Sequence, residues 1–259
     1  MAVADEGSEA NPGPDLGFLR AGRLGDGGPR YTETPRDPSA PGAPWPAEPW
    51  NTLTATFFIV IAVWWIWRLR GRFREFPFLV GCLPILLAGG IGGTLYHSLR
   101  NARFYFYLDV IPISLLGLAG AVFLALKAWK GRGWIYLGVG LVGYVGLSAL
   151  LFTVVRPMPI WQKWSIDGGT VAVNANYAAL ALVILIPVLG MLVRTRFRHA
   201  GWVVAGITSF AIAWFFRLVD HKLGIYLPMG SHWLWHTFGA AATALLIEYF
   251  YRVEKDISP

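Results

Sequence analysis

The chain has little charge and almost no cysteine, and both scarcities limit what it can be. Only 14% of its 259 residues are charged, 55% are hydrophobic, and the mean hydropathy is +0.49. Between residues 51 and 250 there are five acids: Glu75, Asp109, Asp167, Asp220 and Glu248. Because soluble domains carry about 25% charged residues, this composition excludes an ordinary soluble domain and indicates a polytopic membrane protein.

A single cysteine, Cys82, excludes a disulfide within this sequence. The N-terminus also lacks the charged, then apolar, then small-residue order of a secretory signal. Residues 1–46 mix glycine, proline and charges of both signs, and the first long apolar run follows Trp50. Such a segment buries too little apolar surface to offset its chain entropy. We therefore expect a disordered tail over 1–46 and a membrane domain over 47–259.

Apolar stretches long enough to cross a bilayer recur through the membrane domain. A hydrocarbon core of about 30 Å requires roughly 20 apolar residues in helix. The stretches that meet or approach this length are 49–67, 77–96, 104–129, 133–155, 171–193, 201–219 and 232–251. The sequence therefore predicts an all-α bundle of seven transmembrane helices.

Lysine and arginine are distributed unequally between the two sets of loops that such a bundle would have. Twelve lie on the side that holds the C-terminus and six on the other. Because positive charge accumulates on the cytoplasmic side, the bias predicts an external N-terminus and a cytoplasmic C-terminus. The formal net charge of +7 then belongs to loops beside the membrane, so we expect no nucleic-acid partner.

Three histidines lie at ends of these stretches that this topology places on the external side. His97 ends the second stretch, and His232 and His236 begin the seventh at a spacing of i, i+4, which puts them on one helical face. Asp109 lies early in the third stretch, and Glu48 and Asn51 stand at the start of the first. Ionisable groups at membrane depth are costly and mark functional sites. We therefore predict a metal centre made by His97, His232 and His236.

Three imidazoles that leave one position open for water are typical of catalytic zinc. Asp109 is then either a general base for that water or a partner that orients a histidine, and the sequence does not separate the two roles. Haem is the competing use of paired histidines, but an i, i+4 pair on one helix suits a single small ion better. For Asp220, an ion pair with Arg217 at i, i+3 is favoured over direct ligation.

With these residues in place, the chain resembles the alkaline ceramidase family, within a superfamily of seven-helix membrane hydrolases that also includes adiponectin/progestin-type receptors. The resemblance runs from about residue 48 to the C-terminus. Its motifs are Glu48-Pro49-Trp50-Asn51-Thr52, His97, Leu108-Asp109-Val110-Ile111-Pro112 and His232-Trp233-Leu234-Trp235-His236. It implies zinc held by the three histidines, Asp109 near the bound water, and hydrolysis of the N-acyl bond of ceramide to a sphingoid base and a fatty acid.

The chain departs from the family pattern at two places. A serine expected four residues before the first histidine, where it assists the reacting oxygen, is Gly93 here, and Thr94 or Ser98 is the candidate substitute. The acidic segment that binds calcium before the first helix is replaced by residues 41–47, which carry no carboxylate. Glu48 and Asn51 alone would make a poor calcium site, so we expect no calcium dependence and treat both as structural polar contacts.

The expected activity is therefore that of a zinc-dependent hydrolase acting on ceramide or a related acylated membrane lipid at the external (periplasmic or lumenal) leaflet. Two alternatives remain open. One is a lipid esterase or phospholipase of the same superfamily, and the other is a seven-helix receptor or transporter without hydrolase activity.

Overall fold

The computed structural model describes residues 24–163 and 168–257, and over these ranges it is all-α. Its longer helices are α1 (Pro49–Leu69), α2 (Pro77–Leu99), α3 (Arg103–Trp129), α4 (Gly133–Leu150), α6 (Gly168–Arg194), α7 (Ala200–Leu223) and α8 (His232–Ile257). Short pieces lie between them: Phe73–Glu75, Lys130–Arg132, the π-turn Leu151–Val155, and α5 (Ile160–Lys163). Each of the seven predicted stretches corresponds to one long helix.

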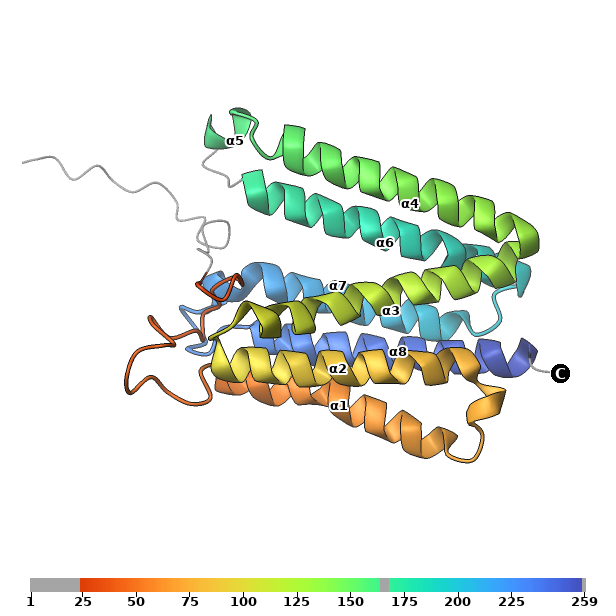
Figure 1. Cartoon of the computed structure of the whole chain (residues 1–259), viewed down its shortest axis with the longest axis horizontal. Coiled ribbons are helices and arrows are strands. Elements are labelled where there is room, and N and C mark those ends of the chain that lie inside the picture. The colour runs from red at the N-terminus through yellow and green to blue at the C-terminus, as the bar shows by residue number, and fades with distance from the viewer. Residues whose placement is uncertain (1–23, 164–167, 258–259) are drawn as a thin grey trace, which may run out of the picture.

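The helices run roughly along one axis as a bundle (Figure 1). α2 packs against α1 and α3, α8 packs against α1 and α7, and α6 packs against α3. α4 lies at the edge, where it contacts α3 and α6. Pro49 and Pro77 begin α1 and α2, where a missing backbone N–H costs nothing because the first turn has no acceptor for it.

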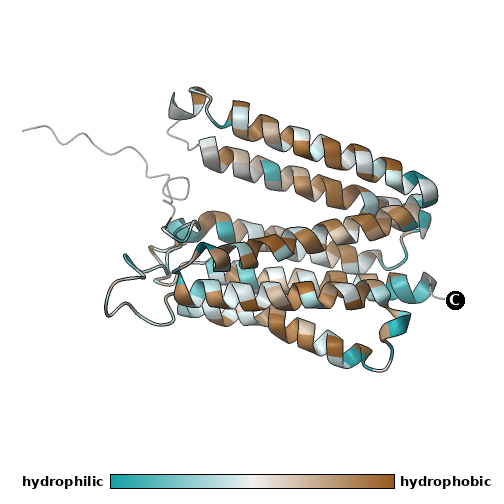
Figure 2. Ribbon diagram, viewed as in Figure 1, coloured by the Kyte–Doolittle hydropathy of each residue, from teal (hydrophilic) through white to brown (hydrophobic). Residues whose placement is uncertain are grey.

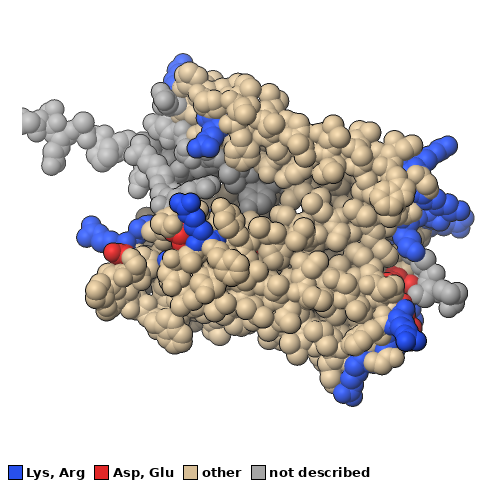
Figure 3. All heavy atoms as spheres, viewed as in Figure 1, with Lys and Arg blue, Asp and Glu red and all other residues tan. Residues whose placement is uncertain are grey.

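Four helical segments of the described chain are long and apolar enough to cross a membrane, namely Pro49–Leu69, Pro77–Leu99, Arg103–Val155 and Ala200–Leu223. The third contains both α3 and α4, which fold back on each other at Lys130–Arg132. Hydrophobic residues make up much of the ribbon between the two ends (Figure 2), whereas lysine and arginine gather at the ends of the visible face (Figure 3). These features indicate an integral membrane protein.

Two clusters of buried apolar side chains hold the helices together. One joins α3, α6, α7 and α8 through Leu124, Val188, Met191, Leu192, Val203, Tyr249 and Val253. The other joins α1, the turn after it and α2 through Trp65, Leu69, Phe76, Leu79 and Leu83. The ends of α2 and α8 that carry the histidines lie at the opposite end of the bundle (Figure 1). Apolar packing thus holds the helices together at one end of the bundle, and polar contacts hold them at the end that carries the histidines.

Candidate metal centre

His97, His232 and His236 come together at one end of the bundle, as predicted. All three are buried, and one ligand atom from each lies within 4.8 Å of the others. The imidazole centroids are 4.7 Å apart for His97 and His236, 4.8 Å for His232 and His236, and 5.5 Å for His97 and His232. This group could hold a metal ion.

Glu48 sets the orientation of His97. Its Oε2 atom lies 2.5 Å from His97 Nδ1 and also accepts a hydrogen bond from Asn51 Nδ2 at 3.1 Å. His97 Nε2 is buried and has no hydrogen-bond partner within the described residues. Metal-bound histidines usually have a hydrogen-bond acceptor such as a carboxylate on one ring nitrogen and the metal on the other. The carboxylate fixes the orientation of the ring and makes the metal-binding nitrogen more basic. Glu48 thus has a more specific part than the polar contact that we expected.

The backbone of α1 orients His236 in the same way. Its Nδ1–H donates to the carbonyl oxygen of Asn51 at 3.0 Å, and Thr54 Oγ1 lies 3.2 Å from the same nitrogen. In that tautomer the lone pair is on Nε2. His97 and His236 therefore both have Nε2 free for an ion.

His232 is positioned through the start of α8. Asp220, at the end of α7, accepts hydrogen bonds from the backbone N–H groups of Ser231 at 2.7 Å and His232 at 2.9 Å. A carboxylate at a helix N-terminus satisfies donors that have no partner within the helix and interacts favourably with its dipole. The buried Nδ1 of His232 has no hydrogen-bond partner within the described residues. Two buried ring nitrogens without partners, on His97 and His232, fit a site for a divalent ion.

Asp109 lies beside this cluster on α3. A Cβ atom placed on Gly93 would come within 2.7 Å of Asp109 Oδ1, so the absence of a side chain at position 93 makes room for the carboxylate. Gly93 precedes His97 by one helical turn, and Asp109 lies near enough to His97 and Arg217 to interact electrostatically with both. Within the described residues no hydrogen bond or ion pair engages the Asp109 carboxylate, which leaves it available for a proton.

The role of Thr94 at the site stays a prediction, and its hydroxyl is engaged within its own helix. Thr94 Oγ1 donates to the carbonyl oxygen of Gly90 at 2.8 Å. Ser98, the other candidate, likewise donates to the carbonyl oxygen of Leu95 at 3.2 Å. Hydroxyls in a helix commonly bond back to the preceding turn, and both of these do so here.

Of the segment 1–46 that we expected to be disordered, the structure describes residues 24–46, part of which contacts the bundle, while residues 1–23 lie outside the described part of the chain. We call residues 24–34 the N-terminal strap. Within it, Thr32 donates from its backbone N–H to Asp220 Oδ2 at 2.9 Å, and the carbonyl oxygen of Arg30 lies 3.0 Å from His221 Nε2. Polar bonds, rather than apolar burial, hold this segment against α7.

The strap also caps the first helix. Glu33 accepts hydrogen bonds from the backbone N–H groups of Trp50 at 2.6 Å and Asn51 at 3.0 Å. Burial raises the pKa of Glu33 above its usual range, and these two hydrogen bonds act against the rise. The strap therefore contacts α1 and α7 close to the histidine cluster.

Arg100 joins the strap to the metal centre in a buried ion network. Its guanidinium contacts Glu48 Oε1 at 2.6 Å and Asp26 Oδ2 at 2.8 Å, and it donates to the carbonyl oxygen of Pro29 at 2.8 Å. Thr34 Oγ1 donates to the same Glu48 oxygen. Arg100 also has a left-handed backbone, with φ of 47°, a conformation that costs a non-glycine residue about 1–3 kcal/mol.

This network accounts for both oxygens of Glu48. One faces His97 and Asn51, and the other faces Arg100 and Thr34. A guanidinium thus already supplies positive charge to Glu48, and the expected independence from calcium stays a prediction that this geometry favours.

Arg100→Met is expected to destabilise the protein by about 3–5 kcal/mol, because it leaves the carboxylates of Asp26 and Glu48 buried without a cation. The measurement is the thermal unfolding midpoint of the purified protein in detergent. Arg132→Met, which removes an exposed arginine at the opposite end of the bundle, is the matched control. Equal midpoints for the two variants would contradict the structural role of the network.

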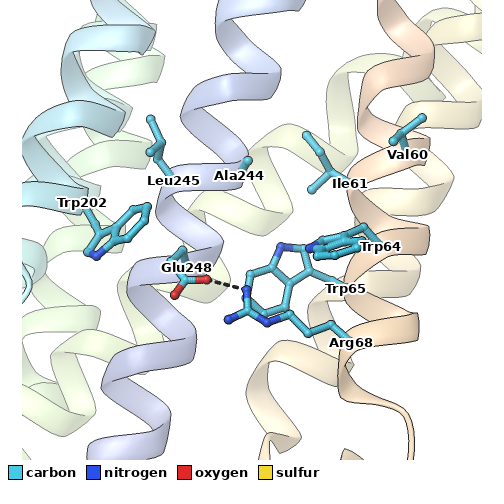
Figure 4. A pocket seen from close by; sticks show the side chains of 9 residues that line it. All are labelled: Val60, Ile61, Trp64, Trp65, Arg68, Trp202, Ala244, Leu245 and Glu248. Atoms are coloured by element: carbon cyan, nitrogen blue, oxygen red, sulfur yellow. Dashed lines mark hydrogen bonds and ion pairs between the residues drawn. The ribbon is translucent and has the colours of Figure 1, made fainter.

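A separate pocket of about 300 Å³ lies between α1, α7 and α8, away from the histidines (Figure 4). Its lining is Val60, Ile61, Trp64, Trp65, Arg68, Trp202, Ala244, Leu245 and Glu248. Arg68 Nη1 pairs with Glu248 Oε2 at 2.7 Å, and Arg252 Nε pairs with Glu248 Oε1 at 2.9 Å. The Glu248 carboxylate at this pocket is thus paired with two arginines.

Comparison with known proteins adds no family: no family model, curated protein or solved structure matches this chain. The function of the protein is therefore inferred from its sequence and from the geometry of the site.

Proposed function

We propose that the protein is a zinc-dependent intramembrane hydrolase that cleaves the N-acyl amide bond of ceramide or a related acylated lipid. The observation that carries the proposal is the carboxylate of Asp109, which has no hydrogen bond or ion pair within the described residues, beside three buried, convergent histidines. The resemblance of its histidine and aspartate motifs to those of alkaline ceramidases supports the same reading.

The donor set suits zinc among the common ions. Three neutral imidazoles form an open tetrahedral site, whereas magnesium and calcium prefer oxygen ligands. When bound, zinc supplies Lewis acidity and lowers the pKa of a bound water to about 7. His97 and His236 would bind through Nε2, with Glu48 and the carbonyl oxygen of Asn51 on their other nitrogens.

Asp109 would move the proton. As a general base it takes a proton from water while the water oxygen forms a bond to the acyl carbon. As a general acid it returns that proton to the amide nitrogen as the C–N bond breaks. The products are a fatty acid and an amine, which for ceramide is the sphingoid base.

The proposal includes seven membrane-spanning helices, an external N-terminus and a site toward the external leaflet. The basic bias of the loops around α1–α2, α3–α4 and α6–α7 supports this orientation. Labelling a Ser39→Cys variant that lacks Cys82 with an impermeant thiol reagent on intact cells tests it, and protection of Ser39→Cys until the cells are lysed would reverse the orientation.

Purified protein is expected to contain one zinc per chain and to release sphingoid base from ceramide. A panel of ceramide, simple acyl amides and phospholipid esters, with zinc measured on the same preparation, tests both statements. Removal of zinc by a chelator should abolish turnover, and added zinc should restore it. Faster cleavage of the esters would identify a lipid esterase instead. Absence of stoichiometric zinc, with unchanged behaviour of a His232→Ala variant, would favour a receptor or transporter.

A further inference from the structure

The proposed chemistry develops negative charge on the carbonyl oxygen of the acyl group, and hydrogen-bond donors aimed at that oxygen lower the barrier. Two hydroxyls of α2 are engaged elsewhere, since Thr94 and Ser98 donate to backbone carbonyls of their own helix. Thr54 Oγ1 donates to the carbonyl oxygen of Trp50 at 2.8 Å. The Tyr96 hydroxyl, which has no hydrogen-bond partner within the described residues, lies against Gly28 of the strap. The side chains of the strap that contact the imidazole rings are therefore the candidates for such a donor.

Tyr31 of the N-terminal strap lies directly against the histidine cluster. Its ring stacks on the imidazole of His232, with centroids 3.6 Å apart and planes inclined by 17°. Its centroid lies 5.6 Å from that of His97, and the guanidinium of Arg100 lies 5.6 Å above the Tyr31 ring. The side chain thus contacts one metal-ligand candidate and adjoins a second.

Neighbouring residues of the strap hold Tyr31 in this place. The backbone N–H of Tyr31 donates to Thr34 Oγ1 at 2.8 Å, and Thr34 in turn donates to Glu48. The next residue, Thr32, contacts Asp220, which also binds the first turn of α8. The groups that orient His97 and His232 therefore also fix the position of Tyr31, which is the preorganisation that a catalytic donor requires.

The hydroxyl of Tyr31 has no hydrogen-bond partner within the described residues, although the charges of Arg217, Arg100, Asp109 and Glu48 act on it. A phenol O–H is a hydrogen-bond donor. We propose, building on the hydrolase function above, that Tyr31 is a catalytic residue whose hydroxyl donates a hydrogen bond to the carbonyl oxygen of the scissile acyl group.

In this assignment Tyr31 and Asp109 have distinct parts. Asp109 carries the proton from water to the leaving nitrogen, and Tyr31 stabilises the oxygen that becomes negative while keeping its own proton. The N-terminal strap then belongs to the active site, and the missing side chain at Gly93 serves the approach of Asp109 instead of supplying a hydroxyl.

Tyr31→Phe removes the hydroxyl but keeps the ring, so it tests the role of the hydroxyl alone. The phenylalanine ring keeps the stack on His232, so bound zinc and the unfolding midpoint should not change, while kcat for ceramide should fall about 100-fold with little change in KM. Tyr107→Phe is the matched control, because Tyr107 is 53% exposed and lies near the start of α3, at the site end of the bundle. This variant should retain full activity. Tyr31→Ala, which also removes the stack, should in addition weaken zinc retention.

A second measurement does not depend on turnover. Octanohydroxamic acid carries a carbonyl oxygen that binds zinc, and titration calorimetry gives its affinity for each zinc-loaded variant. We expect Tyr31→Phe to weaken that affinity about tenfold and Tyr107→Phe to leave it unchanged. Wild-type kcat together with wild-type hydroxamate affinity in Tyr31→Phe would overturn the assignment.

The two measurements also distinguish this proposal from the proposed function. A zinc-loaded wild-type protein that cleaves nothing in the substrate panel removes the hydrolase function. Weaker hydroxamate binding by Tyr31→Phe would even then support the placement of the hydroxyl beside a zinc-bound carbonyl, and equal binding would reject it. A wild-type protein that retains no zinc overturns both proposals.

Discussion

Replacing His97 or His236 with alanine is expected to weaken zinc binding by at least about 100-fold. Each substitution removes one of three protein ligands, whereas loss of a group that merely orients a ligand costs about 10–100-fold. The measurement is zinc per chain after dialysis against chelators of graded strength. Hydrolysis should disappear together with the zinc.

Two further variants sharpen this experiment. His199→Ala is the matched control, because His199 contacts Asp256 through Nε2 at 2.9 Å, at the other end of the bundle. Glu48→Gln tests whether Glu48 orients His97. It should weaken zinc binding more than the control variant does and less than the ligand variants do. Full zinc retention by both His97→Ala and His236→Ala would show that the three imidazoles do not share an ion.

Asp109→Asn is expected to keep zinc and lose hydrolysis, with kcat reduced by about 10²–10⁴-fold. Asparagine has the same shape as aspartate and fits the space beside Gly93, but its amide does not accept the proton of the attacking water. The comparison requires kcat and zinc content from one preparation.

Asp37→Asn, at an exposed position in the loop before α1, is the matched control for Asp109→Asn. Full turnover by Asp109→Asn would refute the proton-transfer role. Loss of zinc from it would instead assign Asp109 to holding the ion or its ligands.

The sequence predicted the histidine cluster because its geometry depends on simple periodicities. His232 and His236 share a face at i, i+4, and the alternation of helix direction brings His97 to the same end. Asp109 followed from the same reasoning, since it lies in the second turn of α3. The placement of these residues follows from the helix boundaries and from the alternating direction of successive helices.

The N-terminal strap could not be predicted in this way. Asp26, Tyr31 and Thr32 belong to a stretch rich in glycine, proline and charge, whose composition is typical of disorder. Their partners Arg100, His232 and Asp220 are far away in sequence, and no periodicity relates the two sets. The sequence held one weak signal for the strap. Arg100 lies three residues after His97, at the end of the bundle that carries the site, and a buried arginine there requires a counter-ion.

The hydrogen bond of Thr94 could not be predicted from the sequence for a different reason. Its position next to Gly93 suggested a replacement hydroxyl, but neighbours in a helix point about 100° apart. Spacing alone does not show where a side chain forms its hydrogen bond, and here the carbonyl oxygen of Gly90 accepts it. The number of membrane crossings stays a prediction, because four segments of the described chain are long and apolar enough to cross a membrane, and one of them contains both α3 and α4.

The contact between Thr32 and Asp220 joins positions 188 residues apart in sequence. The strap is therefore synthesised well before α7 and α8, against which it docks. The histidine cluster can form only once the start of α8 has been made. A nascent chain interrupted before α8 would lack both His232 and His236 and could not assemble the cluster.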